Sequence, residues 1–144
     1  MFNTIGIITK PQDITSQETA RELSAFLKQK DVSLVENQQD IEKNADLIIV
    51  VGGDGSILST ARTYVDSNIP ILGINLGRLG FLADVSVESM INAVSEILSG
   101  EYIKEERALL SCQVEREGSI LSEHLAFNEA VSYTHLTLPT ILLV

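Results

Sequence analysis

The sequence predicts an α/β protein: a doubly wound parallel sheet in an N-terminal domain, followed by the first strands of a β-rich second domain. Short apolar runs alternate with segments whose apolar residues recur at helical spacing. The run DLIIVV at 46–51 is apolar on both faces, as expected of a strand covered by helices on both sides. Near residue 103 the apolar period changes to simple alternation, which indicates antiparallel strands. We therefore expect an α/β domain at 1–103 and the start of a β-rich domain at 104–131.

The elements of the first domain follow from the same patterns. Strands are predicted at the short apolar runs 4–9, 32–36, 46–51 and 69–74. Helices are predicted where apolar residues lie three and four apart, at 15–30, 56–64 and 87–98. Thr15 or Ser16 is the expected N-cap of the first helix, while Ser86 and Gly100 are expected to flank the last.

The second domain is expected to open with a β-hairpin. Ala108, Leu110, Cys112 and Val114 alternate along RALLSCQVER, which predicts a half-buried strand. The tripeptide EGS at 117–119 can turn the chain, and ILSEHLAF can return it as the partner strand.

The last segment, 132–144, is atypical. No charged residue follows Glu129. The segment is either one more buried strand with a break at Pro139, or a tail that is not native to the protein, from a truncated, frame-shifted or misassembled coding sequence.

Composition limits the possible partners and compartments. The 144 residues carry a formal net charge of −10, which disfavours nucleic acid and anionic membranes as partners. The single cysteine, Cys112, excludes an internal disulfide and fits a reducing compartment. We see no signal peptide and no apolar run long enough to span a membrane, and no metal-ligand spacing links Cys112 with His124 and His135.

A glycine-rich loop, VVGGDGSILSTAR at 50–62, follows the most apolar strand. Gly52, Gly53 and Gly55 suit positive φ values and a close approach of phosphate to the backbone at the N-terminus of a helix. Asp54 would repel phosphate, so it is useful there as a proton acceptor or as a ligand of Mg²⁺. The alternative is a tight turn in which Asp54 only caps the next helix. The patterns GxxxxGK[ST] and GxGxxG are absent, which disfavours a P-loop NTPase and an ordinary dinucleotide-binding dehydrogenase.

Two further stretches are candidates for the same site. GINLGRLGFLAD follows the strand at 69–74 and would emerge at the same sheet edge. In it, Leu82 is expected to pack against the sheet, and Arg78 is either a ligand contact or a solvated cation. In FNEAV, Asn128 and Glu129 can reach one ligand only where their strand ends or bends.

Together, VVGGDGSIL, ILGINLGRLGFLADV and NEAV resemble the three N-terminal signatures of bacterial NAD kinases, in the same order. The resemblance covers about residues 3–131. The middle motif is the specific one, because GGDG also occurs in diacylglycerol and sphingosine kinases and in 6-phosphofructokinases. The resemblance implies ATP-dependent phosphorylation of the adenosine-ribose 2′-hydroxyl of NAD to give NADP, with a divalent ion such as Mg²⁺, in a cytoplasmic homo-oligomer.

The resemblance also implies roles for individual residues. Asp54 matches the proton acceptor, and the backbone of Gly55 would lie against the dinucleotide. Asn128 and Glu129 match residues that hydrogen-bond the adenosine end of NAD, and Phe81 would form a wall of the adenine pocket.

The chain departs from the family at its C-terminal end. NAD kinases continue beyond the Asn–Glu pair into a β-sandwich-like domain that supplies much of the NAD pocket. We therefore expect an N-terminal portion whose family sequence ends near Val131 and which is inactive alone. A lipid kinase of the diacylglycerol or sphingosine type and a non-catalytic nucleotide-binding module remain the alternatives.

Overall fold

The computed structural model describes residues 2–77, 80–83 and 85–126. The chain divides into two compact units, residues 1–104 and residues 105–144. Each unit is described by itself.

The first unit is built on a five-stranded parallel sheet with the order β2-β1-β3-β4-β5. Its strands are β1 (Thr4–Thr9), β2 (Ser33–Val35), β3 (Leu47–Gly52), β4 (Ile71–Asn75) and β5 (Val85–Ser86). Its helices are α1 (Ile14–Gln29), α2 (Gln38–Asn44), α3 (Asp54–Thr63) and α4 (Met90–Ser99), with a 3₁₀ turn η1 (Val65–Ser67) after α3.

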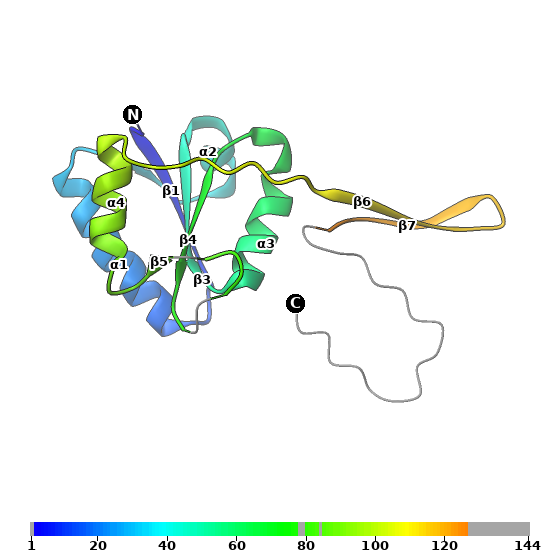
Figure 1. Cartoon of the computed structure of the whole chain (residues 1–144), viewed down its shortest axis with the longest axis horizontal. Helices are drawn as coiled ribbons and strands as arrows, with labels where there is room; N and C mark the ends of the chain where they lie inside the picture. Colours follow the sequence, from blue (N-terminus) through cyan, green and yellow to red (C-terminus); the bar gives the residue numbers. More distant parts are fainter. Residues whose placement is uncertain (1, 78–79, 84, 127–144) are drawn as a thin grey trace. The chain divides into compact units, whose positions relative to one another are not determined.

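Helices cover both faces of this sheet, which confirms the predicted doubly wound α/β class (Figure 1). The central strand β3 is buried along its whole length. Its side chains alternate between the two layers: Ile49 and Val51 pack with α1 and α4, while Ile48 and Val50 pack with α2 and α3. A strand buried on both faces needs an uninterrupted apolar sequence, and this is what 46–51 provides.

The strand order places a switch point between β1 and β3. From β1 the chain crosses to β2 on one side, and it then continues to β3 on the other side of β1. The connecting segments therefore diverge at the carboxyl ends of β1 and β3. In open α/β sheets a crevice forms at this position.

The N-cap of α1 differs from the prediction. The helix begins after Asp13, whose Oδ1 accepts a hydrogen bond from the Ser16 amide at 3.1 Å, so Thr15 and Ser16 lie inside the helix. Ser16 is fully buried, and its hydroxyl donates instead to the Val51 carbonyl at 2.7 Å. Because Asp13 caps the helix, the serine hydroxyl is left to join α1 to β3.

The start of α4 differs as well. Ser86 lies in β5, paired with Asn75, and the N-cap is Ser89. The short strand takes up the predicted N-cap, and residues 87–89 form a turn, so the helix begins three residues later than predicted. The predicted end is confirmed, since Gly100 is the C-cap with φ of 92°.

We predict that Ser16→Ala lowers the free energy of unfolding by about 1–2 kcal/mol. The buried hydroxyl donates to the Val51 carbonyl and accepts from the Lys10 amide at 3.3 Å, so its removal deletes two hydrogen bonds that join α1 to the ends of β3 and β1. Urea unfolding followed by circular dichroism measures the change. Ser24→Ala is the control, because that hydroxyl bonds only the Ala20 carbonyl of its own helix and alanine favours helix. Equal stability of the two variants would contradict the role of Ser16.

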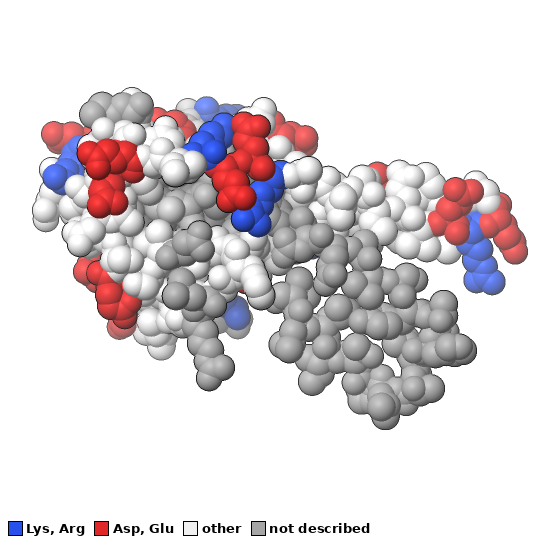
Figure 2. Space-filling model, viewed as in Figure 1, with Lys and Arg blue, Asp and Glu red and all other residues white. Residues whose placement is uncertain are grey.

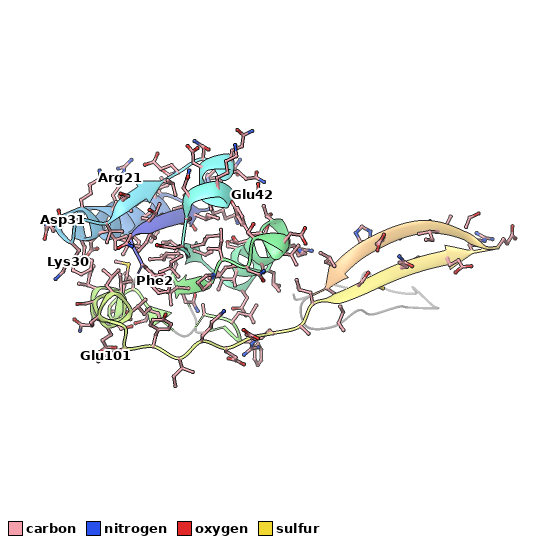
Figure 3. All side chains as sticks on the ribbon, turned by 90° about the horizontal axis from the view of Figure 1, so that it is seen from above. Phe2, Arg21, Lys30, Asp31, Glu42 and Glu101 are labelled. Atoms are coloured by element: carbon pink, nitrogen blue, oxygen red, sulfur yellow. The ribbon has the colours of Figure 1, made fainter. Side chains whose placement is uncertain are left out.

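A hollow of about 320 Å³ lies at the amino end of β1. Lys30 and Asp31 mark the end of α1 beside it, and Phe2 lies at its edge (Figure 3). The Phe2 ring contacts the Tyr102 ring, with 5.4 Å between centroids. This contact fastens the segment after α4 to the start of the sheet.

Acidic side chains are dispersed over the face of the molecule drawn in Figure 2, with basic side chains beside several of them. Within the described residues, no helix is long and apolar enough to cross a membrane.

The described part of the second unit is the antiparallel hairpin of β6 (Leu110–Arg116) and β7 (Ser119–Ala126). Glu117 and Gly118 both have positive φ, 52° and 76°, which is typical of the tight turns that match the strand twist. The predicted hairpin and its turn are confirmed. The expected half-burial is wrong for the described residues: Leu110 and Val114 are 47% and 50% exposed, because the described part of this unit is two strands without a second layer.

Candidate functional site

A cleft of about 650 Å³ lies at the carboxyl ends of β1, β3 and β4, at the switch point of the sheet. Each of these strands contributes to its lining through the residues that end it or follow it. The lining residues are Ile8, Thr9, Lys10, Pro11, Asp13, Gly52, Gly53, Gly55, Ser56, Ser59, Thr60, Asn75, Leu76 and Gly77. Both predicted glycine loops therefore border one cleft.

The first glycine loop joins β3 directly to α3. Gly53 is the N-cap, and because it has no side chain, no cap side chain covers the first turn of the helix. The helix N-terminus opens on the cleft, where its dipole favours an anionic group.

The expectation of positive φ in this loop is wrong. The glycines with positive φ are Gly100 and Gly118, and Gly53 is extended at φ −108° and ψ −174°. The reason for glycine here is space. A Cβ on Gly52 would lie 2.7 Å from the Ser56 hydroxyl oxygen, while Gly53 and Gly55 face open space on the cleft side. Their bare backbone is what a ligand can approach.

Asp54 is the first residue of α3, and its side chain is half-buried. Its carboxylate reaches the second glycine loop: Oδ2 accepts from the Phe81 amide at 2.9 Å, and Oδ1 accepts from the Leu82 amide at 3.2 Å. Asp54 is therefore not a helix cap. Asp54 itself is not among the residues that line the cleft, although its neighbours Gly53 and Gly55 are, because its carboxylate is directed at the amides of Phe81 and Leu82. A carboxylate offers about four acceptor sites, so two amide bonds leave capacity for a ligand hydroxyl.

The described part of the second loop, residues 80–83, is fixed by packing at one end and exposed in the middle. Ala83 is fully buried, and Leu82 packs with the cluster formed by α2 and α3, which confirms its expected place against the sheet. Phe81 is 89% exposed. Arg78 lies outside the described residues.

Asn128 and Glu129 also lie outside the described residues. Of the four predicted site residues, Asp54 and Gly55 lie together in the first turn of α3, and Gly55 lines the cleft. The roles predicted for all four stay predictions.

Sequence reasoning missed several residues of the cleft. Lys10 and Thr9 come from the end of β1, and Asn75 comes from the end of β4, where its Oδ1 accepts from the Gly77 amide at 3.1 Å. The signal that could have found them is their position, since each ends or follows a predicted strand. Using it requires the strand order, which places β1 and β4 on either side of β3.

The charged groups of the site do not form a metal cage. Among the residues that the structure describes, no group of three or more His, Cys, Asp or Glu side chains could hold a metal ion.

Two shifted pKa values lie elsewhere in the first unit. Burial and the nearby Glu42 raise the pKa of Tyr64. Hydrogen bonds from its own backbone amide and from Ser86 lower the pKa of Glu88. Neither residue lines the cleft.

Comparisons with known proteins agree with this geometry. Residues 33–102 match the model of the ATP-NAD kinase N-terminal domain. The chain is 39% identical to the NAD kinase of Hydrogenovibrio crunogenus, over 91% of this chain and 51% of that protein. It is 40% identical to the NAD kinase of Teredinibacter turnerae, over 90% of this chain and 50% of that protein. The chain thus spans about half the length of the curated relatives it matches.

Two solved structures have the same fold. The yeast NADH kinase complexed with NADH aligns with a TM-score of 0.70 and 22% identity, covering 85% of this chain and 45% of that chain. An NAD kinase from Archaeoglobus fulgidus in complex with ATP aligns with a TM-score of 0.57 and 24% identity, covering 81% of this chain and 45% of that chain.

The open parallel sheet, with a glycine-lined cleft at its switch point, defines a doubly wound α/β domain of the ligand-binding type. Within that class the sequence match is specific. The chain belongs to the ATP-NAD kinase family and contains the N-terminal domain of that family.

Proposed function

We propose that this chain supplies the N-terminal domain of an NAD kinase, which transfers the γ-phosphoryl group of ATP to the adenosine-ribose 2′-hydroxyl of NAD and so produces NADP. The carrying observation is the carboxylate of Asp54, which stands between two glycines of the cleft at the start of α3 and accepts from two amides of the second glycine loop, in a chain of this family. The relatives that share the fold were solved with NADH and with ATP, which supports these two substrates.

The reaction needs one proton acceptor and a fixed geometry. The 2′-oxygen forms a bond to the γ-phosphorus, the bond from that phosphorus to the β,γ-bridging oxygen breaks, and ADP leaves with that electron pair. The hydroxyl proton passes to the Asp54 carboxylate. Because phosphoryl transfer has a loose transition state, orientation of the hydroxyl by Asp54 contributes as much as removal of its proton.

The remaining binding roles follow the family pattern. The backbone of Gly55 lies against the dinucleotide, Asn128 and Glu129 bond its adenosine end, and the exposed Phe81 ring forms a wall of the adenine pocket. Mg²⁺ fits as a metal–nucleotide complex rather than in a protein cage, because it is commonly held by one or two carboxylates together with substrate phosphates. Bound in this way it neutralises phosphate charge.

The proposal extends to the organisation of the protein. Residues 1–103 form the α/β domain and 104–131 begin the β-rich NAD-binding domain of a cytoplasmic homo-oligomer. The tail 132–144 is not native to the family. No charged residue follows Glu129, which supports a foreign origin for this segment. A continuous reading frame in the source gene that encodes this same tail would contradict its foreign origin.

The test uses two proteins. The 144-residue chain, titrated with NAD and with ATP in a calorimeter, is expected to bind weakly and to form no NADP. A chimaera that joins residues 1–131 to the part of the Teredinibacter turnerae NAD kinase beyond the matching region is expected to form NADP from NAD and ATP. A folded chimaera that phosphorylates diacylglycerol or sphingosine and not NAD, or that binds nucleotide without turnover, would overturn the proposal.

A further inference from the structure

The contact between Asp54 and the second loop depends on the absence of a side chain at residue 80. The Asp54 carboxylate lies directly over Gly80 while it accepts from the amides of Phe81 and Leu82. A Cβ on Gly80 would collide with Cγ and with both carboxylate oxygens of Asp54, closer than real Cβ atoms approach any neighbour. Any side chain at residue 80 therefore competes with the carboxylate for the same space.

The other explanation for a glycine, backbone conformation, does not apply at this position. Gly80 is not among the glycines with positive φ. Gly77, earlier in the same loop, also lacks positive φ, and a Cβ there would meet nothing within 4 Å. Space for the carboxylate is thus the requirement that distinguishes Gly80 from Gly77.

We propose that Gly80 is a positioning residue for Asp54: by lacking a side chain it allows the carboxylate to fasten residues 80–82 to the start of α3. The atoms in the way are the end of a flexible side chain rather than backbone. Gly80→Ala therefore displaces the carboxylate and leaves the sheet intact. The consequence for catalysis rests on the function proposed for Asp54, whereas the fastening itself does not.

The test is amide hydrogen exchange by NMR on the 144-residue chain without any substrate. In Gly80→Ala, the Phe81 and Leu82 amides lose a charged acceptor, and their exchange is expected to accelerate about tenfold or more. The amides of β3 are expected to keep their protection. Gly77→Ala is the matched control, and it is expected to leave the exchange at residues 81 and 82 unchanged. Unchanged exchange in Gly80→Ala, or an equal acceleration throughout β3, would overturn the proposal.

A double-mutant cycle separates positioning from a merely structural need for glycine. Asp54→Ala removes all three atoms with which the new Cβ collides, and by itself it is expected to accelerate exchange at residues 81 and 82 to the same degree. If Gly80 acts through the carboxylate, adding Gly80→Ala to Asp54→Ala changes the exchange no further. If the double variant instead accelerates exchange by the product of the two single factors, Gly80 acts independently of Asp54 and the proposal is overturned.

The two proposals fail separately. The exchange measurements involve no ligand, so their failure leaves the phosphoryl transfer untouched. A chimaera that makes no NADP while its Phe81 and Leu82 amides keep their protection would instead overturn the proposed function and leave the fastening in place.

Discussion

Asp54→Asn in the chimaera is expected to lower turnover with NAD and ATP by about two orders of magnitude or more, with the fold intact. An asparagine cannot take the proton of the ribose hydroxyl. It can also serve only one of the two loop amides as an acceptor, because its own NH₂ group donates and would face the other N–H. Steady-state kinetics of NADP formation measure the loss, and circular dichroism checks the fold.

Asp66→Asn is the matched control for this prediction. It removes the same charge from the exposed residue 66 in η1, which does not line the cleft. We expect its turnover to stay near that of the unmodified chimaera. Near-normal turnover of Asp54→Asn would contradict the assignment of Asp54 as proton acceptor. Asp54→Asn removes both the proton acceptor and part of the contact with the second loop. Gly80→Ala separates these two effects, because it keeps the carboxylate and removes only its hydrogen bonds to the loop.

The alternation of strands and helices could be predicted from sequence because each buried strand is continuously apolar. The run at 46–51 became β3, in which Ile48, Ile49, Val50 and Val51 are all fully buried. The short elements could not be predicted in this way. Helix α2 buries only Ile41, and β5 has two residues, so neither produces a period that can be recognised.

Only part of the site could be predicted, because side-chain patterns are visible in a sequence and backbone contacts are not. Glycine loops after apolar strands gave the edge of the sheet and the position of Asp54. The partners of Asp54 are backbone N–H groups 27 and 28 residues away, and every residue except proline has such a group. No side-chain pattern can encode a contact of this kind. Gly80 is the one feature of the sequence that reflects this contact. Its reason can be recognised only in the structure, where the Asp54 carboxylate lies over it.

Gly73→Val is expected to cost about 3 kcal/mol of the free energy of unfolding, the largest effect on stability proposed here. Gly73 is buried in β4 beneath α3. A Cβ there would collide with Cδ1 of Ile57 and would lie 3.2 Å from Cβ and 3.3 Å from Cα of Ala83. The Ile57 side chain can yield, whereas the Ala83 backbone cannot without moving the second loop.

Urea unfolding of the 144-residue chain measures this cost, with Gly77→Val as the control at a glycine that faces open space. A smaller change tests the cause. Gly73→Ala should destabilise the fold, and adding Ile57→Val, which removes the colliding Cδ1 atom, should recover part of the loss. If the double variant is no more stable than Gly73→Ala, Ile57 is not the obstacle. The close packing of α3 on β4 sets the distance from Asp54 to the second loop. If Gly73→Val is as stable as Gly77→Val, this packing is not the reason for glycine at residue 73.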